Sequence, residues 1–184
     1  MKSSLKSFLG VLKDVQHISA LLVKGAIAAP LVAAWVKLGP PPAMLIGFLT
    51  TCAEVLTIIL IFDAWTQGKK RTLQRAFPYT MAAFFVGIFV SISLLYWFSD
   101  LPPGRNLRII EGFVLRDDLK AVVTSTYTEQ DALRDAEYDP YQVWQRWSVV
   151  SMIVLLSVLW TATFSALASC LAIFVLKYRG SKLG

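Results

Sequence analysis

Long runs of apolar residues, separated by short polar segments, recur along most of this chain. Four of these runs have the length of a membrane span and cover about residues 18–38, 43–63, 78–98 and 148–178. A helix needs about 20 apolar residues to cross the hydrocarbon core of a bilayer, whereas core helices of soluble proteins have apolar runs of roughly 10 to 14 residues. The pattern therefore predicts an all-α membrane protein built as a four-transmembrane-helix bundle, with helices 1–3 within residues 18–98.

The first part of the chain has an amphipathic pattern. Within residues 1–17, apolar side chains share one helical face, which consists of Leu5, Phe8, Leu9, Leu12 and Val15. Several lysines lie largely off this face, so we expect a basic amphipathic helix at the membrane surface. The following run contains Lys24 and Pro30. Two readings stay open for this run: a complete span with Lys24 reaching the interface, or a re-entrant segment that leaves three complete spans.

Residues 99–147 form a polar insertion between the third and fourth predicted spans, and their pattern predicts a small, mostly helical fold. Apolar residues within 107–114 indicate a short strand or a buried turn, and residues 117–123 have helical spacing. Thr128 and Asp131 resemble a capping pair that starts a short helix through about Tyr138. Asp139 and Pro140 predict another helix start, from which the last helix would continue into the membrane without a break.

Charge is divided between these segments. Residues 99–147 carry nine acidic and six basic residues, a net charge of −3, while the rest of the chain nets +9. Lys69, Lys70, Arg71 and Arg75 form a basic loop between the second and third spans, and residues 179–184 form a basic tail. The positive-inside rule then predicts a multi-pass protein of a cell inner membrane, with both termini and the basic loop cytoplasmic and the insertion periplasmic. This distribution explains the excess positive charge, so we expect no nucleic-acid partner.

Glu54 is the candidate functional residue that the pattern singles out, because it lies near the middle of the second span. A carboxylate is costly there and should face protein, water or a partner. Thr50 and Thr57 share its helical face, which predicts a polar stripe that could line an ion path. The structural alternative is a protonated Glu54 that is hydrogen-bonded between helices. Lys24 could pair with Glu54, or its ammonium group could simply reach the interface.

Small and hydroxyl residues recur at spacings of three and four in the last span, at Ser157, Thr161 and Ser165, and continue at Ala168 and Ala172. Such residues let helices approach closely, which predicts tight packing. They could also form a hydroxyl-lined pore wall where several copies of the helix meet.

Enzymatic readings have little support in the sequence. His17 is the only histidine, and Cys52 and Cys170 lie within apolar runs, so we expect no metal site and no cofactor. No nucleophile or phosphate-binding motif is evident. The acidic group Asp131, Asp135, Glu137 and Asp139 could bind a divalent cation, although a solvated helix face is the simpler explanation.

These observations predict a homo-oligomeric channel or pore-like membrane protein, because one small bundle cannot enclose a solvated path alone. The alternative is a non-catalytic accessory or scaffold subunit of a larger membrane complex. The layout of short-looped helices with an insertion before the last resembles that of small bacterial channel-forming effectors. The expected partners are the lipid bilayer and either further copies of this chain or another membrane subunit.

Overall fold

The structure is a computed structural model, which describes residue 29 and residues 43–102, 108–124 and 127–182. The predicted amphipathic helix of residues 1–17, the first predicted span and Lys24 lie outside the described residues. Within the described part, helices account for most of the chain, and three of them are long and apolar enough to cross a membrane: Met44–Thr66, Lys70–Trp97 and Arg146–Lys177. This supports the all-α membrane class, and the described residues hold three of the four predicted spans.

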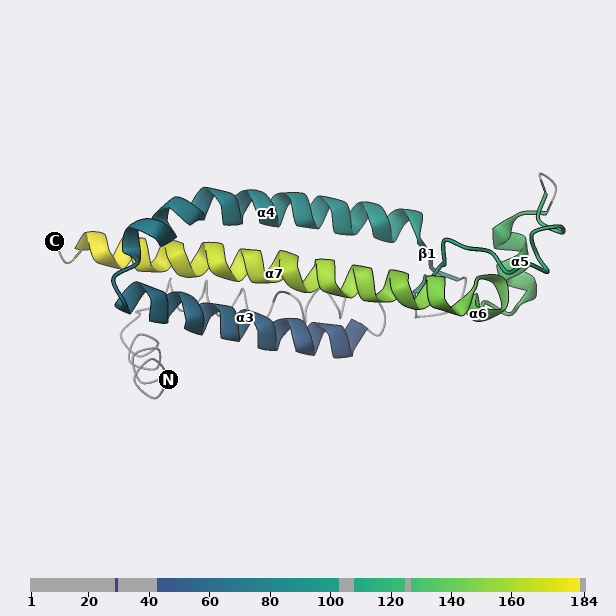
Figure 1. Ribbon diagram of the computed structural model, residues 1–184, viewed down its shortest axis with the longest axis horizontal. Helices are drawn as coiled ribbons and strands as arrows, with labels where there is room; N and C mark the ends of the chain where they lie inside the picture. Colours follow the sequence, from purple (N-terminus) through teal and green to yellow (C-terminus); the bar gives the residue numbers. More distant parts are fainter. Residues whose placement is uncertain (1–28, 30–42, 103–107, 125–126, 183–184) are drawn as a thin grey trace.

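Helix α7 (Arg146–Lys182) is the central element of the bundle. It packs along α3 (Ala43–Thr66) on one side and along α4 (Lys70–Trp97) on the other, while α3 and α4 contact each other at few positions (Figure 1). Helices α3 and α7 run in the same direction, and α4 runs antiparallel to both. At 1.5 Å per residue, α7 is about 55 Å long, so it extends well beyond the roughly 30 Å of hydrocarbon that it can span.

The turn between α3 and α4 is shorter than the predicted basic loop. Helix α4 begins at Lys70, so Lys70, Arg71 and Arg75 lie on its first turns rather than in a loop, and all three are exposed. Gly68 occupies the left-handed region with φ of +84°, a conformation that glycine adopts without steric cost. This residue allows the chain to reverse direction within a few residues, which removes the need for a longer loop.

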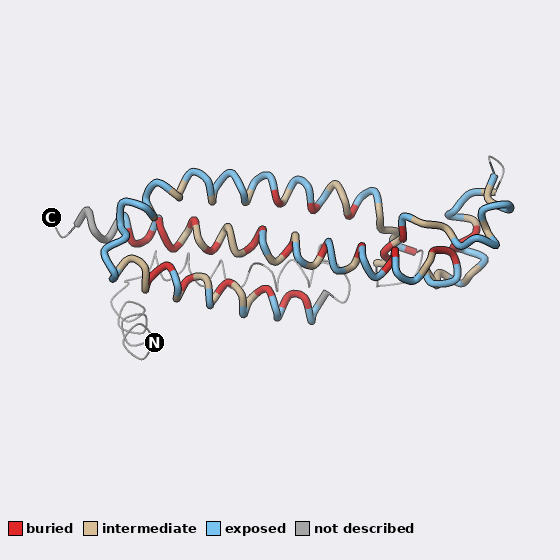
Figure 2. Tube along the Cα trace, viewed as in Figure 1, coloured by how far each residue is buried: buried red, intermediate tan, exposed pale blue. Residues whose placement is uncertain are grey.

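The side chains on the bundle surface are largely apolar, as a lipid-facing surface requires. On α4 only Gly87, Ser91 and Leu95 are buried, and most of the remaining length is exposed (Figure 2). The exposed positions include large apolar side chains such as Phe85 and Phe89. Burial on α7, in contrast, recurs from Ser148 to Leu176 because the helix has neighbours on two sides.

The polar insertion lies at the end of the bundle away from the α3–α4 turn (Figure 1). It contains a two-stranded antiparallel pair, β1 (Ser99–Asp100) and β2 (Ile109–Ile110), in which Ser99 pairs with Ile110 and Asp100 with Ile109. Helices α5 (Glu129–Asp135) and α6 (Pro140–Val143) follow. The predicted short strand within residues 107–114 is thus confirmed. The predicted helix over residues 117–123 is wrong, since this segment forms turns.

The predicted capping pair is confirmed. Thr128 caps α5 by accepting a hydrogen bond from the Asp131 backbone N–H at 3.3 Å, and the Asp131 carboxylate accepts from the Thr128 backbone N–H at 2.9 Å. This reciprocal arrangement satisfies two N–H groups that the helix itself leaves free. The helix ends at Asp135, three residues earlier than predicted.

The predicted continuous helix from Asp139 is wrong. Asp139 caps α6 as expected, but the chain is extended at Trp144 and α7 begins only at Arg146. The break has a tertiary cause: Trp144 forms an isolated β-bridge with Leu115, and the Gln145 backbone N–H donates to the Val114 carbonyl at 2.9 Å. The side chain of Trp144 is buried in the core of the insertion, with Leu133 and Val143.

Candidate functional site

Glu54 lies in the middle of α3 and is fully buried, with 0% of its surface exposed. Thr50, one helical turn earlier on the same face, is also 0% exposed. Residues four apart in a helix lie above one another, so the two side chains belong to one stripe that faces the interior of the protein. The sequence therefore identified the interior face of α3 correctly.

A hydroxyl pair connects this stripe to the central helix. The hydroxyl oxygens of Thr50 and Thr161 are 3.0 Å apart, a hydrogen-bonding distance across the contact between α3 and α7. The two helices run in the same direction, so Glu54 on α3 and Ser165 on α7 each follow this pair by one helical turn. The structure thus brings Thr50 and Thr161, two of the residues predicted from different spans, into contact.

Neither carboxylate oxygen of Glu54 has a hydrogen-bond partner among the described residues. A buried carboxyl group without a donor or acceptor is costly in any protein, and a charged one is still more costly within a bilayer. Ser91 Oγ and Trp160 Nε1 are also buried without a partner among the described residues, but Glu54 is the ionisable side chain of this set within the described bundle, and packing alone does not explain it.

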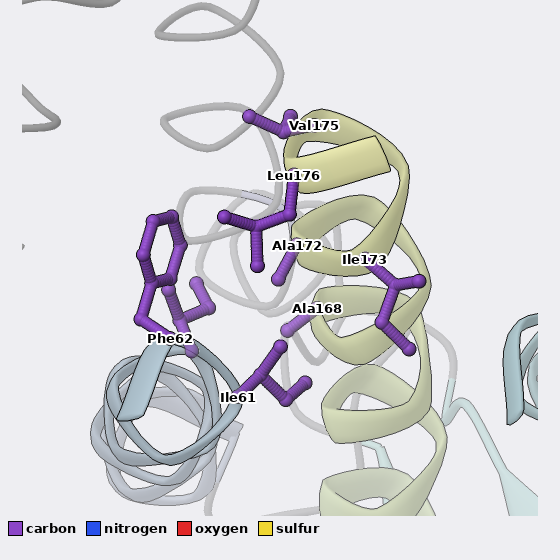
Figure 3. Close-up of a cluster of buried hydrophobic side chains, with 8 residues drawn as sticks. Ile61, Phe62, Ala168, Ala172, Ile173, Val175 and Leu176 are labelled. Atoms are coloured by element: carbon purple, nitrogen blue, oxygen red, sulfur yellow. The ribbon is translucent and has the colours of Figure 1, made fainter. Parts of the chain in front are cut away.

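The same face of α3 becomes apolar immediately after Glu54. Ile58 and Phe62, at the next two positions of the stripe, belong to a buried cluster with residues of the last part of α7. Figure 3 shows Phe62 of α3 on the side of α7 from which Ala172 and Leu176 project, while Ile173 projects from the other side of α7. An apolar layer therefore separates Glu54 from the end of the bundle that carries Lys69 and the other basic residues.

The remaining predicted pore-lining residues are less buried than Glu54 and Thr50. Thr57, Ser157 and Ser165 are half-buried. The Thr57 hydroxyl donates to the Ala53 carbonyl at 2.8 Å, and the Ser157 hydroxyl donates to the Ile153 carbonyl at 2.6 Å. Such bonds satisfy the hydroxyl hydrogen within its own helix, so Thr57 and Ser157 do not need a polar path to explain them.

A second close contact, on the opposite face of α7, involves a partner that the sequence did not identify. Thr163 is buried against Gly87 of α4, and a Cβ atom at Gly87 would collide with the Thr163 side chain. Residues 161 and 163 differ by about 200° around a helix, so they point toward different neighbours. The signal in the sequence was Gly87 itself, which marks close helix contact, but only the central position of α7 reveals its partner.

The four residues of the predicted cytoplasmic basic anchor, Lys69, Lys70, Arg71 and Arg75, are all exposed. The Lys70 ammonium group lies 5.9 Å from the centroid of the Trp65 ring, within the range of a cation–π contact. Lys70 therefore lies beside an aromatic side chain at the end of α3, an arrangement suited to a membrane interface.

The acidic group of the insertion has structural roles in the fold. Asp131 and Asp139 cap helices, and the Tyr127 hydroxyl donates to Asp135 at 2.7 Å. The hydrogen bonds from Thr128 hold the pKa of Asp131 below its usual value, and the bond to Asp135 raises the pKa of Tyr127. Among the described residues, no three His, Cys, Asp or Glu side chains gather as metal ligands.

Comparison with protein families, with curated proteins and with solved structures finds no match to this chain. The class that the fold defines is therefore a helical protein with a polar insertion and, within the residues that the structure describes, three membrane-spanning candidates. Any function has to be argued from the residues themselves.

Proposed function

We propose that the protein is a homo-oligomeric channel or pore-like protein of a bacterial inner membrane, in which Glu54 controls the passage of cations or protons. The observation that carries the proposal is the full burial of Glu54 without a hydrogen-bond partner among the described residues. An ionisable side chain in a membrane-spanning helix is expensive, and the default explanation for retaining one is function.

The position of Glu54 defines where such a channel would be closed. Glu54 lies inside one copy rather than on the outer surface, and the layer containing Ile58 and Phe62 separates it from one end of the bundle. Apolar constrictions block ions because water is unstable in them. We place the closed gate at this layer, and opening would separate α3 from α7 so that water reaches Glu54, Thr50 and Thr161.

Other copies of the chain would complete the path. One small bundle has too few helices to surround a water-filled opening after α3 moves away from α7. The broad apolar surface of α4, with Phe85 and Phe89 exposed, is available for contact with neighbouring copies as well as with lipid. Oligomeric assembly lets several copies share one pore.

The proposed topology has four spans with both termini cytoplasmic and residues 99–147 periplasmic. It is supported by the exposed basic residues at the α3–α4 turn and by Lys177, which is exposed on the last turns of α7 at the same end of the bundle (Figure 1). The positive-inside rule assigns such an end to the cytoplasm.

Electrical recording tests the role of Glu54. The purified protein is reconstituted into planar bilayers, and wild type is compared with Glu54→Gln, which removes the charge but keeps the shape. We expect a changed open probability or ion selectivity. Asp63→Asn is the matched control, because Asp63 lies at the end of the same helix and its Oδ2 already accepts a bond from Gln67 at 2.6 Å. Identical currents from wild type and Glu54→Gln would remove Glu54 from the mechanism.

A second candidate is a non-catalytic accessory subunit, favoured by how little of α4 is buried. In that case α4 would pack against a different membrane protein rather than another copy. The mass of the purified protein in nanodiscs, corrected for lipid, separates the two candidates. A discrete homo-oligomer supports the channel, whereas a monomer that is stable only with a co-purified subunit supports the accessory role.

A further inference from the structure

A pocket of about 390 Å³ lies where the bundle meets the insertion, at the end opposite the basic residues. It is formed between the end of α4, the segment after β2, the start of α5 and Trp144, which lies two residues before α7. Six of its lining side chains are aromatic or acidic: Trp97, Phe98, Phe113, Trp144, Glu111 and Glu129. Neither the proposed gate nor the caps of the insertion use these side chains.

The wall that contains Glu111 is fixed by backbone contacts. The Glu111 N–H donates to the Phe98 carbonyl at 2.9 Å, which continues the pairing of β1 with β2 by one residue. The next residue, Gly112, packs so closely that an added Cβ atom would collide with Trp144 and Ser148. Glu111 is therefore held between two anchored points of the chain and is positioned before any ligand arrives.

The pocket is negatively charged. Glu111 and Glu129 line it, Asp100 lies near enough to repel the Glu111 carboxylate, and none of the described lining side chains is a lysine or arginine. Neither lining carboxylate has a hydrogen bond or ion pair with another described side chain. Burial, and then repulsion from Asp100 and Glu129, raises the pKa of Glu111 to about 7. A positive charge in the pocket would relieve this repulsion.

The aromatic lining restricts the kind of cation. Trp and Phe rings attract organic cations through the negative potential of their faces, and pockets that combine such rings suit alkylated ammonium groups. A divalent metal ion would need a fuller set of oxygen ligands, and the described residues hold no three His, Cys, Asp or Glu side chains grouped as ligands. The pocket thus matches a bulky, weakly hydrated cation better than a metal ion.

We propose that this pocket binds an organic ammonium group, with Glu111 and Glu129 supplying the counter-charge and the exposed rings of Trp97 and Phe113 supplying the aromatic walls. The pocket lies beyond the ends of the apolar helices, at the level expected for lipid headgroups. The ammonium group therefore comes either from a phospholipid headgroup or from a free amine in solution. This proposal does not depend on the channel function.

Binding of choline to the protein in nanodiscs made only of phosphatidylglycerol tests the proposal for a free amine. Isothermal titration with choline chloride is compared with sodium chloride at equal ionic strength. We expect saturable binding of choline, weakened about tenfold by Glu111→Gln and by Glu129→Gln, which corresponds to about 1.4 kcal/mol for each carboxylate. Glu137→Gln is the matched control, because Glu137 is exposed and lies outside the pocket lining.

The lipid arm uses nanodiscs that contain equal amounts of phosphatidylcholine and phosphatidylglycerol. Native mass spectrometry then shows whether phosphatidylcholine stays bound and whether Glu111→Gln releases it. Retained phosphatidylcholine without binding of free choline identifies the headgroup as the source, and saturable choline binding identifies a free amine. Circular dichroism of each variant verifies that the helices are intact. The proposal would be overturned if choline bound no better than sodium and phosphatidylcholine no better than phosphatidylglycerol. It would also be overturned if Glu111→Gln and Glu129→Gln left this binding unchanged.

Discussion

The bundle and the insertion use their carboxylates in opposite ways. In the insertion, Asp131 and Asp139 are placed at helix starts, where backbone N–H groups satisfy them. In the bundle, Glu54 is fully buried and has no partner among the described residues. An acid that caps a helix is explained by the fold that it stabilises, whereas an acid that the fold leaves without compensation calls for a functional explanation.

Both regions also have a glycine at a close contact, Gly87 in the bundle and Gly112 in the insertion. Substitution of Gly87 should have the largest effect on stability. Gly87→Leu would force a side chain into the space occupied by Thr163, which separates α4 from α7. Overpacking of this kind costs about 1 to 3 kcal/mol and occasionally more. We expect a clear fall in the unfolding midpoint in a denaturing-detergent titration followed by circular dichroism. Ala83→Leu, on the exposed face of α4, is the control and should unfold like wild type.

Removing the buried carboxyl group of Glu54 should raise the stability of the protein rather than lower it. We expect Glu54→Met to stabilise the protein by about 1 to 3 kcal/mol, because an unpaired polar group is replaced by an apolar side chain of similar length. The same titration measures this change. A decrease in stability would mean that Glu54 has a compensating partner outside the described residues, and it would move Glu54 from the functional to the structural group of carboxylates.

In the insertion, loss of the helix cap of α5 should lower the stability of the protein rather than raise it. Thr128→Ala removes the hydroxyl that accepts from the Asp131 N–H and should cost about 1 kcal/mol. Because α5 is short and packs locally, we expect faster hydrogen exchange at the amides of residues 129–135, while α3 amides keep their rates. Gln130→Ala, an exposed change on the same helix, should leave the exchange rates of α5 nearly unchanged.

The features that the sequence predicted correctly are those governed by local rules. Apolar run length predicted the spans that became α3, α4 and α7, and the spacing of Thr128 and Asp131 predicted the start of α5. The break before α7 escaped prediction because it depends on the pairing of Trp144 with Leu115, which is distant along the chain. A local rule that recognises Asp139 and Pro140 as a helix start cannot detect such a partner.

The candidate site also has some features that local rules predict and others that depend on contacts between distant residues. The burial of Glu54 and Thr50 follows from helical periodicity, so the sequence could identify both. The contact of Thr50 with Thr161 and that of Gly87 with Thr163 require knowledge that α7 lies between the other two helices. Glu111 gave no signal in the sequence, where it is one of nine acidic residues in the insertion. Its environment arises only when the strand pair forms.

Glu111 lies in the insertion but, like Glu54, is a carboxylate that its surroundings do not compensate, and its effect on stability should depend on pH. Its pKa of about 7 in the folded protein lies above the usual value of 4.5, because burial and two acidic neighbours disfavour the charged form. Below about pH 4.5 the group is protonated in both states and has no effect. As pH rises toward 7, the unfolded chain loses this proton first, so stability falls, and above pH 7 the full penalty remains. Glu111→Gln should therefore raise the thermal unfolding midpoint at pH 8 and leave it nearly unchanged at pH 4. An equal shift at both pH values would show that the substitution acts through packing, and Glu137→Gln should show no such pH-dependent gain.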